Sequence, residues 1–172
     1  MDTYSAPERP RIPNSGPERL QLDAWLDFYR ATILMKCDGL SEEQLKQRPI
    51  ATSTLSLLGL VRHLTFVEQV WFETTFAGRD VTEYYKTAED RDLDFTDLDS
   101  DSVEDVFARF DRACALSREL ALGHDLDEMG ARPRGEREVD LRWMYVHCIE
   151  EYARHLGHAD ILRELIDGAT GY

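Results

Sequence analysis

Apolar residues recur along most of the chain with the spacing of amphipathic helices. The first such segment, Glu18–Cys37, carries a broad apolar stripe and is followed by Gly39, a residue that commonly ends helices. Ser41 and Gln44 then form a capping-box pattern for a short helical turn, which Pro49 stops. No segment shows the two-residue alternation of a half-buried strand.

A second long helix is predicted over Leu55–Phe76, with Ser53 or Thr54 as its N-cap and Gly78 after its end. This segment is apolar on more than one side, which indicates a central position in the fold. His63 lies inside the apolar run. A lone histidine in such a place is more often a hydrogen-bonded core residue than a metal ligand.

Two further helices are predicted in the second half of the chain. Ser102 caps the third helix, and the fourth runs from Asp140 or Leu141 to about Asp167. The stretch Arg79–Asp101 between the second and third helices is acidic and has no helical period. We expect it to be a long surface connection whose charges are solvated.

Four amphipathic helices without strands or repeats predict an all-α fold, a four-helix bundle. The connection between the second and third helices exceeds twenty residues and is long enough to cross an end of the bundle. A crossover topology is therefore expected in place of a simple up-down-up-down order. Residues 1–16 contain three prolines and are predicted to be an extended or disordered lead-in, with residues 17–172 forming one domain.

The composition fits a globular domain and narrows the range of partners. The chain has 172 residues, 42% of them hydrophobic, and neither a membrane-spanning apolar run nor an export leader is expected. A formal charge of −14 repels phosphate backbones and anionic lipid, so we expect neither nucleic acid nor membranes as partners. Three scattered cysteines indicate reduced thiols in a cytoplasm.

The last predicted helix places several metal-binding side chains on one face. At 100° per residue, an arc of about 80° around this helix contains His147, Glu151, His155 and His158. Desolvated imidazoles and carboxylates need partners, which a divalent metal would supply. A polar seam of hydrogen bonds between helices is the alternative. A metal site begun at Glu151 and His155 needs a ligand from elsewhere, and His63 is the one distant histidine on a helical core face.

Three stretches resemble the DinB-like superfamily, and together they span most of the chain from about Glu18 onward. They are Trp25-Leu-Asp-Phe-Tyr-Arg-Ala-Thr32, Ser56-Leu-Leu-Gly-Leu-Val-Arg-His63-Leu with Trp71-Phe72 and Ala77-Gly78, and Arg142-Trp143 with Glu150-Glu-Tyr-Ala-Arg-His-Leu-Gly-His-Ala-Asp160 and Arg163-Glu-Leu-Ile-Asp-Gly168. The resemblance implies a four-helix bundle that holds one divalent metal through three ligands. Many members use three histidines, and the subgroup that includes mycothiol-dependent maleylpyruvate isomerase has a glutamate in place of one.

Carried over by position, this resemblance implies that His63, Glu151 and His155 are the metal ligands. Two imidazoles and one carboxylate leave coordination positions free, as in catalytic sites. Zinc is our first choice for the metal, and nickel or iron would also accept these ligands. His158 is a candidate fourth ligand, a catalytic acid or base, or a partner that fixes Glu151, and His147 poses the same question.

The function expected from this site is a thiol-dependent S-transferase or isomerase-like enzyme. A small thiol such as mycothiol, bacillithiol or glutathione would be the cosubstrate and would attack a small electrophile. Arg30 and Arg154 are candidates for binding a substrate carboxylate, or alternatively form salt bridges with Glu150 or another acidic residue. The alternative function is a non-enzymatic metal-binding or stress-associated protein. The aromatic content also suggests a homodimer.

Overall fold

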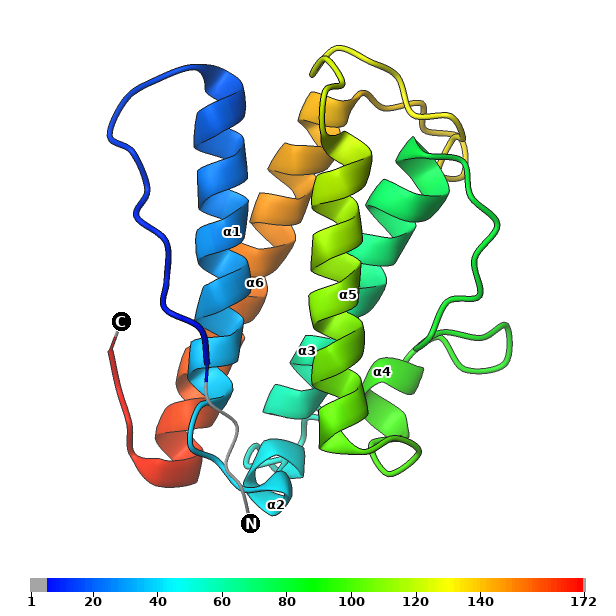
Figure 1. Cartoon of the computed structure of the whole chain (residues 1–172). Helices are drawn as coiled ribbons and strands as arrows, with labels where there is room; N and C mark the ends of the chain where they lie inside the picture. Colours follow the sequence, from blue (N-terminus) through cyan, green and yellow to red (C-terminus); the bar gives the residue numbers. More distant parts are fainter. Residues whose placement is uncertain (1–5, 172) are drawn as a thin grey trace.

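The computed structural model describes residues 6–171, and these form an all-helical bundle (Figure 1). The long helices are α1 (Glu18–Cys37), α3 (Leu57–Glu68) with its continuation as the π-helix η1 (Gln69–Phe76), α5 (Val103–Ala121) and α6 (Leu141–Asp167). The short helices α2 (Glu42–Lys46) and α4 (Leu93–Thr96) lie in the connections. Only isolated β-bridges occur in the described part of the chain, and the predicted all-α bundle is confirmed.

The connection between η1 and α5 determines the directions of the helices. In Figure 1, α1 descends and α3 rises into η1, after which residues 77–102 return along the side of the bundle. Helix α5 therefore rises in the same direction as α3, and α6 descends. The expected crossover is present, although it follows the length of the bundle and does not cross an end.

Side-chain caps fix several helix boundaries where the sequence predicts them. Ser41 Oγ accepts from the Gln44 backbone N–H at 3.3 Å, and the Gln44 side chain accepts from the Ser41 N–H at 3.0 Å. Ser102 and Asp140 each accept from the backbone N–H three residues onward, at 3.1 and 2.7 Å. Gly168 has φ 78° and ends α6 in the left-handed conformation.

The second long helix ends at Phe76 as predicted, but its start and the helix type of its last turns differ from the prediction. The N-cap is Ser56, whose Oγ accepts from the Gly59 N–H at 3.0 Å, so the prediction of Ser53 or Thr54 is wrong. The helix widens into η1 from Gln69 onward, a change that hydrophobic periodicity does not distinguish from α-helix. π-helical segments are rare and often occur at functional sites.

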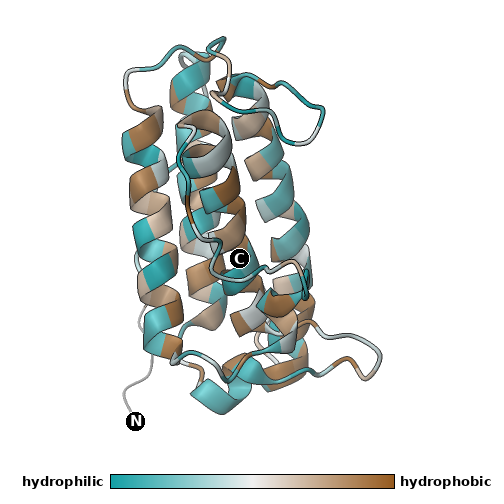
Figure 2. Cartoon of the chain, turned by 90° about the vertical axis from the view of Figure 1, so that its right-hand side faces the viewer, coloured by the Kyte–Doolittle hydropathy of each residue, from teal (hydrophilic) through white to brown (hydrophobic). Residues whose placement is uncertain are grey.

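Helix α3 occupies the centre of the bundle, as its apolar circumference predicts. Every residue of α3 except His63 is buried. In Figure 2 the helices carry brown apolar and teal polar residues in turn, as expected of amphipathic helices around a shared core. None of the described helices is both long and apolar enough to cross a membrane.

An ion pair lies inside this core. Arg30 donates through Nε and Nη2 to the two carboxylate oxygens of Glu68, at 2.8 and 2.6 Å, and Tyr152 Oη donates to Glu68 Oε1 at 2.8 Å. Burial acts to raise the pKa of Glu68, but the Arg30 guanidinium outweighs it and holds that pKa below its ordinary value. Because the three residues belong to α1, α3 and α6, the network ties these helices together.

Removing one charge of this pair should destabilise the protein strongly. In Glu68→Leu the Arg30 guanidinium stays buried and keeps only Asp27 as a charged partner. We expect a loss of about 3–5 kcal/mol in the free energy of unfolding. The double variant Arg30→Met/Glu68→Leu removes both charges and should recover most of that loss. Urea denaturation measures both. A single-variant loss below about 1 kcal/mol, the range of exposed pairs, would contradict a buried pair.

Candidate functional site

The three residues expected to bind a metal lie together between α3 and α6. One nitrogen or oxygen atom from each of His63, Glu151 and His155 lies within 4.8 Å of the other two. Glu151 Oε2 is 3.3 Å from His155 Nε2 and 3.8 Å from His63 Nε2. Glu151 and His155 meet because residues four apart share one face of a helix. Their side chains and that of His63 are 11–18% exposed, so the cluster keeps some contact with solvent.

The cluster has the donor atoms that a divalent metal requires. His63 Nε2 is buried and has no hydrogen-bond partner among residues 6–171. An unpaired buried nitrogen is costly, and a metal ion would satisfy it. Two imidazole nitrogens with one carboxylate oxygen suit zinc and other first-row divalent ions. The residues therefore fit a metal site, and their role as ligands is taken up as a proposal below.

Asp94 of α4 orients His63 from the outside. Its Oδ2 lies 2.8 Å from His63 Nδ1, and the carboxylate is fully buried. An Nδ1–H donated to Asp94 leaves the Nε2 lone pair directed toward Glu151. Sequence analysis missed Asp94 because it assigned the acidic connection to solvent. The flanking apolar residues Leu93 and Phe95 were the available signal, and Phe95 stacks on the His63 ring at 5.7 Å.

His147 occupies the other side of the Glu151 carboxylate. Its Nε2 is 3.5 Å from Glu151 Oε1, whereas the clustered imidazoles face Oε2. The ring stacks on Trp143 at 4.8 Å and meets Trp71 edge-on at 4.7 Å, so its orientation is fixed by packing. A second group of side chains that could hold a metal consists of His147, Glu150 and Glu151, of which Glu150 is exposed.

His158 lies behind His155, on the side away from the cluster. The two Nδ1 atoms are 3.3 Å apart, while His155 Nε2 faces Glu151. This geometry favours an outer partner of His155 among the predicted roles of His158, and disfavours a fourth ligand. Burial and the neighbouring His155 lower the pKa of His158, which favours the neutral ring that can accept a hydrogen bond.

Neither arginine predicted to bind substrate joins this cluster. Arg30 is held in the core by Glu68 and also donates to Asp27 at 2.8 Å. Arg154 is exposed, with its Nη2 3.3 Å from Glu150 Oε1. Both arginines therefore form the ion pairs that the sequence left open as their alternative role, Arg154 with the expected residue and Arg30 with a different one.

Comparison with known proteins identifies the family of this domain. The family model for mycothiol-S-transferases matches residues 21–168, which include the whole cluster. The chain belongs to the mycothiol-S-transferase family. That family is part of the DinB-like superfamily, and the resemblance seen in three helices is confirmed. A comparison with curated proteins found no match.

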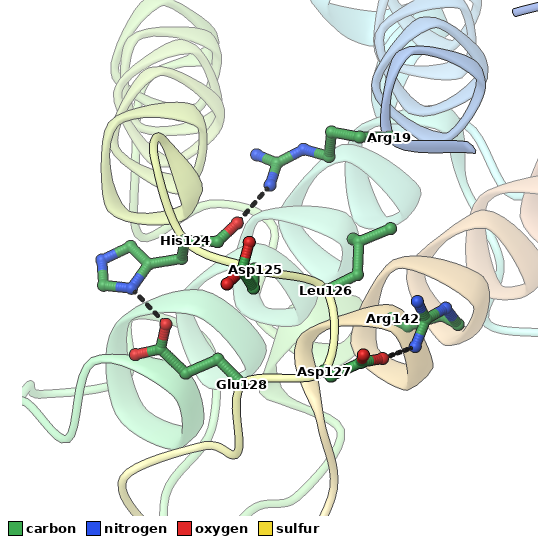
Figure 3. Close-up of a pocket in the computed structure, with 7 residues that line it drawn as sticks. All are labelled: Arg19, His124, Asp125, Leu126, Asp127, Glu128 and Arg142. Carbon is green, nitrogen blue, oxygen red and sulfur yellow. Dashed lines mark hydrogen bonds and ion pairs between the residues drawn. The ribbon is translucent and has the colours of Figure 1, made fainter. Parts of the chain in front are cut away.

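One cavity of this mycothiol-S-transferase family member lies away from the cluster. It measures about 630 Å³ and is found where α6 begins (Figure 3). Arg19 donates there to the carbonyl of His124 at 3.1 Å, and Arg142 pairs with Asp127. Arg142 precedes Glu151 by nine residues, about 13 Å along a helix axis. This cavity therefore does not adjoin His63 and His155. Both of its arginines are already paired with groups of the protein.

Contacts within and around the cluster lower the pKa of Glu151 and raise the pKa of His63. The imidazoles of His155 and His63 hold the pKa of the Glu151 carboxyl far below its ordinary value. Burial acts to lower the pKa of His63, but Asp94 and Glu151 outweigh it and raise that pKa. In the metal-free mycothiol-S-transferase domain, His63 therefore holds a proton to higher pH than a free histidine does.

The stabilising effect of Asp94 in the metal-free protein should shrink as the pH rises. A group whose pKa is raised by folding stabilises the folded state fully below its unfolded pKa, about 6.5 for histidine, and loses this contribution above its folded pKa. The measurement is the free energy of unfolding of chelator-treated wild type and Asp94→Asn between about pH 5.5 and 8.5.

Both proteins contain His158, whose lowered pKa changes the free energy of unfolding with pH in the opposite direction. This contribution cancels in the difference between wild type and Asp94→Asn, which leaves the effect of His63. The difference in free energy of unfolding should be largest at the acidic end of the range. A pH-independent difference for Asp94→Asn would contradict the pairing of its carboxylate with a protonated His63.

Proposed function

We propose that this protein is a metal-dependent mycothiol S-transferase that joins the sulfur of mycothiol to a carbon of a small electrophile. The observation that carries the proposal is the cluster of His63, Glu151 and His155 inside the range matched by the mycothiol-S-transferase model. The family supports the thiol, and the donor atoms support the metal.

One divalent ion would be held by His63 Nε2, Glu151 Oε2 and His155 Nε2. Zinc is the first choice, and nickel or iron would suit the same donors. When bound, such an ion lowers the pKa of a coordinated thiol and makes a thiolate available at neutral pH. Three protein donors leave room for that thiol beside them.

The surrounding side chains would hold the three donors in place. Asp94 accepts the Nδ1–H of His63 and directs its Nε2 inward. His147, fixed by its stacking on Trp143, lies against the outer oxygen of Glu151. His158 is the outer partner of the remaining imidazole. Partners of this kind set the tautomer and orientation of metal-binding side chains.

The transfer exchanges the S–H bond of the thiol for a C–S bond. With a substrate that carries a leaving group, that group departs with the bonding electrons and the thiol proton goes to solvent. With an activated double bond, the proton ends on the neighbouring carbon. Thiol-assisted isomerisation would begin with the same addition and end with release of the thiol.

Non-enzymatic metal binding is the second candidate function. The observation that favours it is the enclosure of the cluster by aromatic rings, with Phe95 stacked on His63 and Trp143 on His147. The clustered side chains are only 11–18% exposed, which leaves little surface for a substrate unless the residues around the site move. Turnover with a thiol separates the two candidates.

A cytoplasmic location and a homodimer belong to the same proposal. The three cysteines are free and buried, as in a reducing compartment. The dimer would cover exposed apolar side chains on the outer faces of α1 and α6. These are Leu20 and Trp25 on α1, and Val146, Ile161 and Leu165 on α6.

Protein purified without an affinity tag should contain close to one equivalent of divalent metal. His155→Ala should lose the metal, whereas His124→Ala, which alters an exposed loop histidine, should retain it. Chelation should lower the melting temperature at neutral pH more than in acid, where protonated histidines already release the ion. Elemental analysis that finds equal metal in wild type and His155→Ala would remove this residue from the ligand set.

Metal-loaded protein should consume mycothiol in the presence of a reactive electrophile. His155→Ala should abolish metal content and rate together. Arg154→Ala should keep the metal, and an increase in KM would show that Arg154 binds the substrate ground state, whereas an unchanged KM supports its pair with Glu150. Absence of turnover with mycothiol, bacillithiol and glutathione across varied electrophiles would favour the non-enzymatic candidate.

A further inference from the structure

Two cations adjoin the cluster through a single aromatic ring. Phe66 follows His63 by one turn of α3, and the centres of the two rings are 6.5 Å apart. Lys86 Nζ lies 4.7 Å from the centre of the Phe66 ring, and Arg134 Cζ lies 6.0 Å from the same centre. These three residues, Phe66, Lys86 and Arg134, are termed the cationic rim.

The rim is assembled from segments far apart in the sequence. Lys86 belongs to the connection between η1 and α4, and Arg134 to the loop between α5 and α6. Phe66 is buried in α3 beneath both. The two loops therefore bring positive charge over the Phe66 ring, and His63 is a further neighbour of that ring.

The charge of Arg134 is only weakly compensated. Its Nη1 atom is 3.9 Å from Glu83 Oε1, and its side chain is 43% exposed. Arg132, two residues earlier in the same loop, makes a close pair with Asp80 at 2.7 Å. Arg134 therefore keeps donors for a further anion.

Lys86 is similarly placed with respect to acidic groups. Its Nζ donates to the carbonyl of Arg91 at 2.9 Å and is 4.0 Å from Asp94 Oδ2. That carboxylate oxygen already accepts from His63. An ammonium group with one carbonyl acceptor has two further protons to donate. Lys86 can thus join Arg134 in binding the same negatively charged group.

We propose that the cationic rim binds an anionic group, a carboxylate, on the electrophile that the cluster acts upon. This proposal rests on the proposed transferase function and names its substrate class. The substrate would lie beside Phe66, with its carboxylate toward Lys86 and Arg134 and its reactive carbon toward His63. Charge-assisted hydrogen bonds from the two cations would fix the carboxylate.

The rim replaces the two arginines that the sequence suggested for the same task. Arg30 is committed to Glu68 inside the core, and Arg154 pairs with Glu150 on the surface. A strongly acidic protein repels anions at long range, so an anionic substrate requires cations close to the site. Lys86 and Arg134 meet that requirement. The competing account is that they only fasten their loops to α3 through cation–π contacts.

A pair of electrophiles that differ in charge tests the proposal. The probes are 4-chloro-3-nitrobenzoate and 4-chloro-3-nitrobenzamide, each assayed with mycothiol and the metal-loaded protein. In both, a C–S bond forms, chloride leaves with the electrons of the C–Cl bond, and the thiol proton goes to the buffer. For each probe, kinetic constants of a variant are compared with those of wild type, so that differences in intrinsic reactivity cancel.

The double variant Lys86→Gln/Arg134→Gln should raise KM for the benzoate about tenfold, the loss expected for charge-assisted hydrogen bonds. Its KM for the benzamide should stay within about twofold of wild type, and its metal content should be unchanged. Arg132→Gln is the matched control, since it removes a cation from the same loop, and it should leave both KM values unchanged. Equal changes for the two probes, or the same benzoate effect in Arg132→Gln, would overturn the proposal.

Equilibrium dialysis of the benzoate without thiol separates this proposal from the proposed function. Wild type should bind the benzoate at least about fivefold more tightly than the double variant, whether or not it is turned over. Tighter wild-type binding without turnover would refute the transferase and retain the rim. Equal binding by both proteins, with a lowered melting temperature in the double variant, would show that Lys86 and Arg134 only hold the loops.

Discussion

The buried carboxylate of Glu68 is the constraint on which the arrangement of the bundle depends. A charge with no exposed surface must meet donors wherever the helices pack, and Arg30 from α1 and Tyr152 from α6 supply them. Glu68 follows His63 on α3 by little more than one turn, and Tyr152 is next to Glu151 on α6. The contacts that satisfy Glu68 therefore also bring the two halves of the cluster into register.

The crossover connection supplies the cluster with a polar partner that a simple up-down-up-down bundle would lack. Because residues 77–102 return along the bundle, α4 reaches the side of α3 and inserts Asp94 against His63. The same connection carries Lys86 to Phe66. A short turn between consecutive antiparallel helices would leave no segment to supply either group. The topology thus determines which polar partners the clustered residues have.

The parts of this structure that sequence analysis predicted are those governed by local chemistry. The Ser41 capping box and the four-residue spacing of Glu151 and His155 follow from helix geometry alone. His63 was a candidate because it is a distant histidine on a helical core face, and the family resemblance then implied it as a ligand. Asp94 escaped prediction because its contact with His63 depends on packing between segments distant in sequence. The π-helical turns of η1 escaped it because hydrophobic periodicity does not distinguish them from α-helix.

In the proposed transferase, the metal ligands and the substrate-binding cations belong to different kinds of segment. The clustered residues stand on α3 and α6, whose spacing is fixed by the core. The helical arginines around the cluster are committed elsewhere. Arg30 pairs with Glu68 and Arg154 with Glu150, and Arg62 donates to the backbone carbonyls of Leu93 and Asp97. Positive charge near the cluster therefore has to come from the loops, as it does with Lys86 and Arg134. Since loops tolerate change better than core helices, the proposed site could keep its helical cluster while the loops around it adapt to different electrophiles.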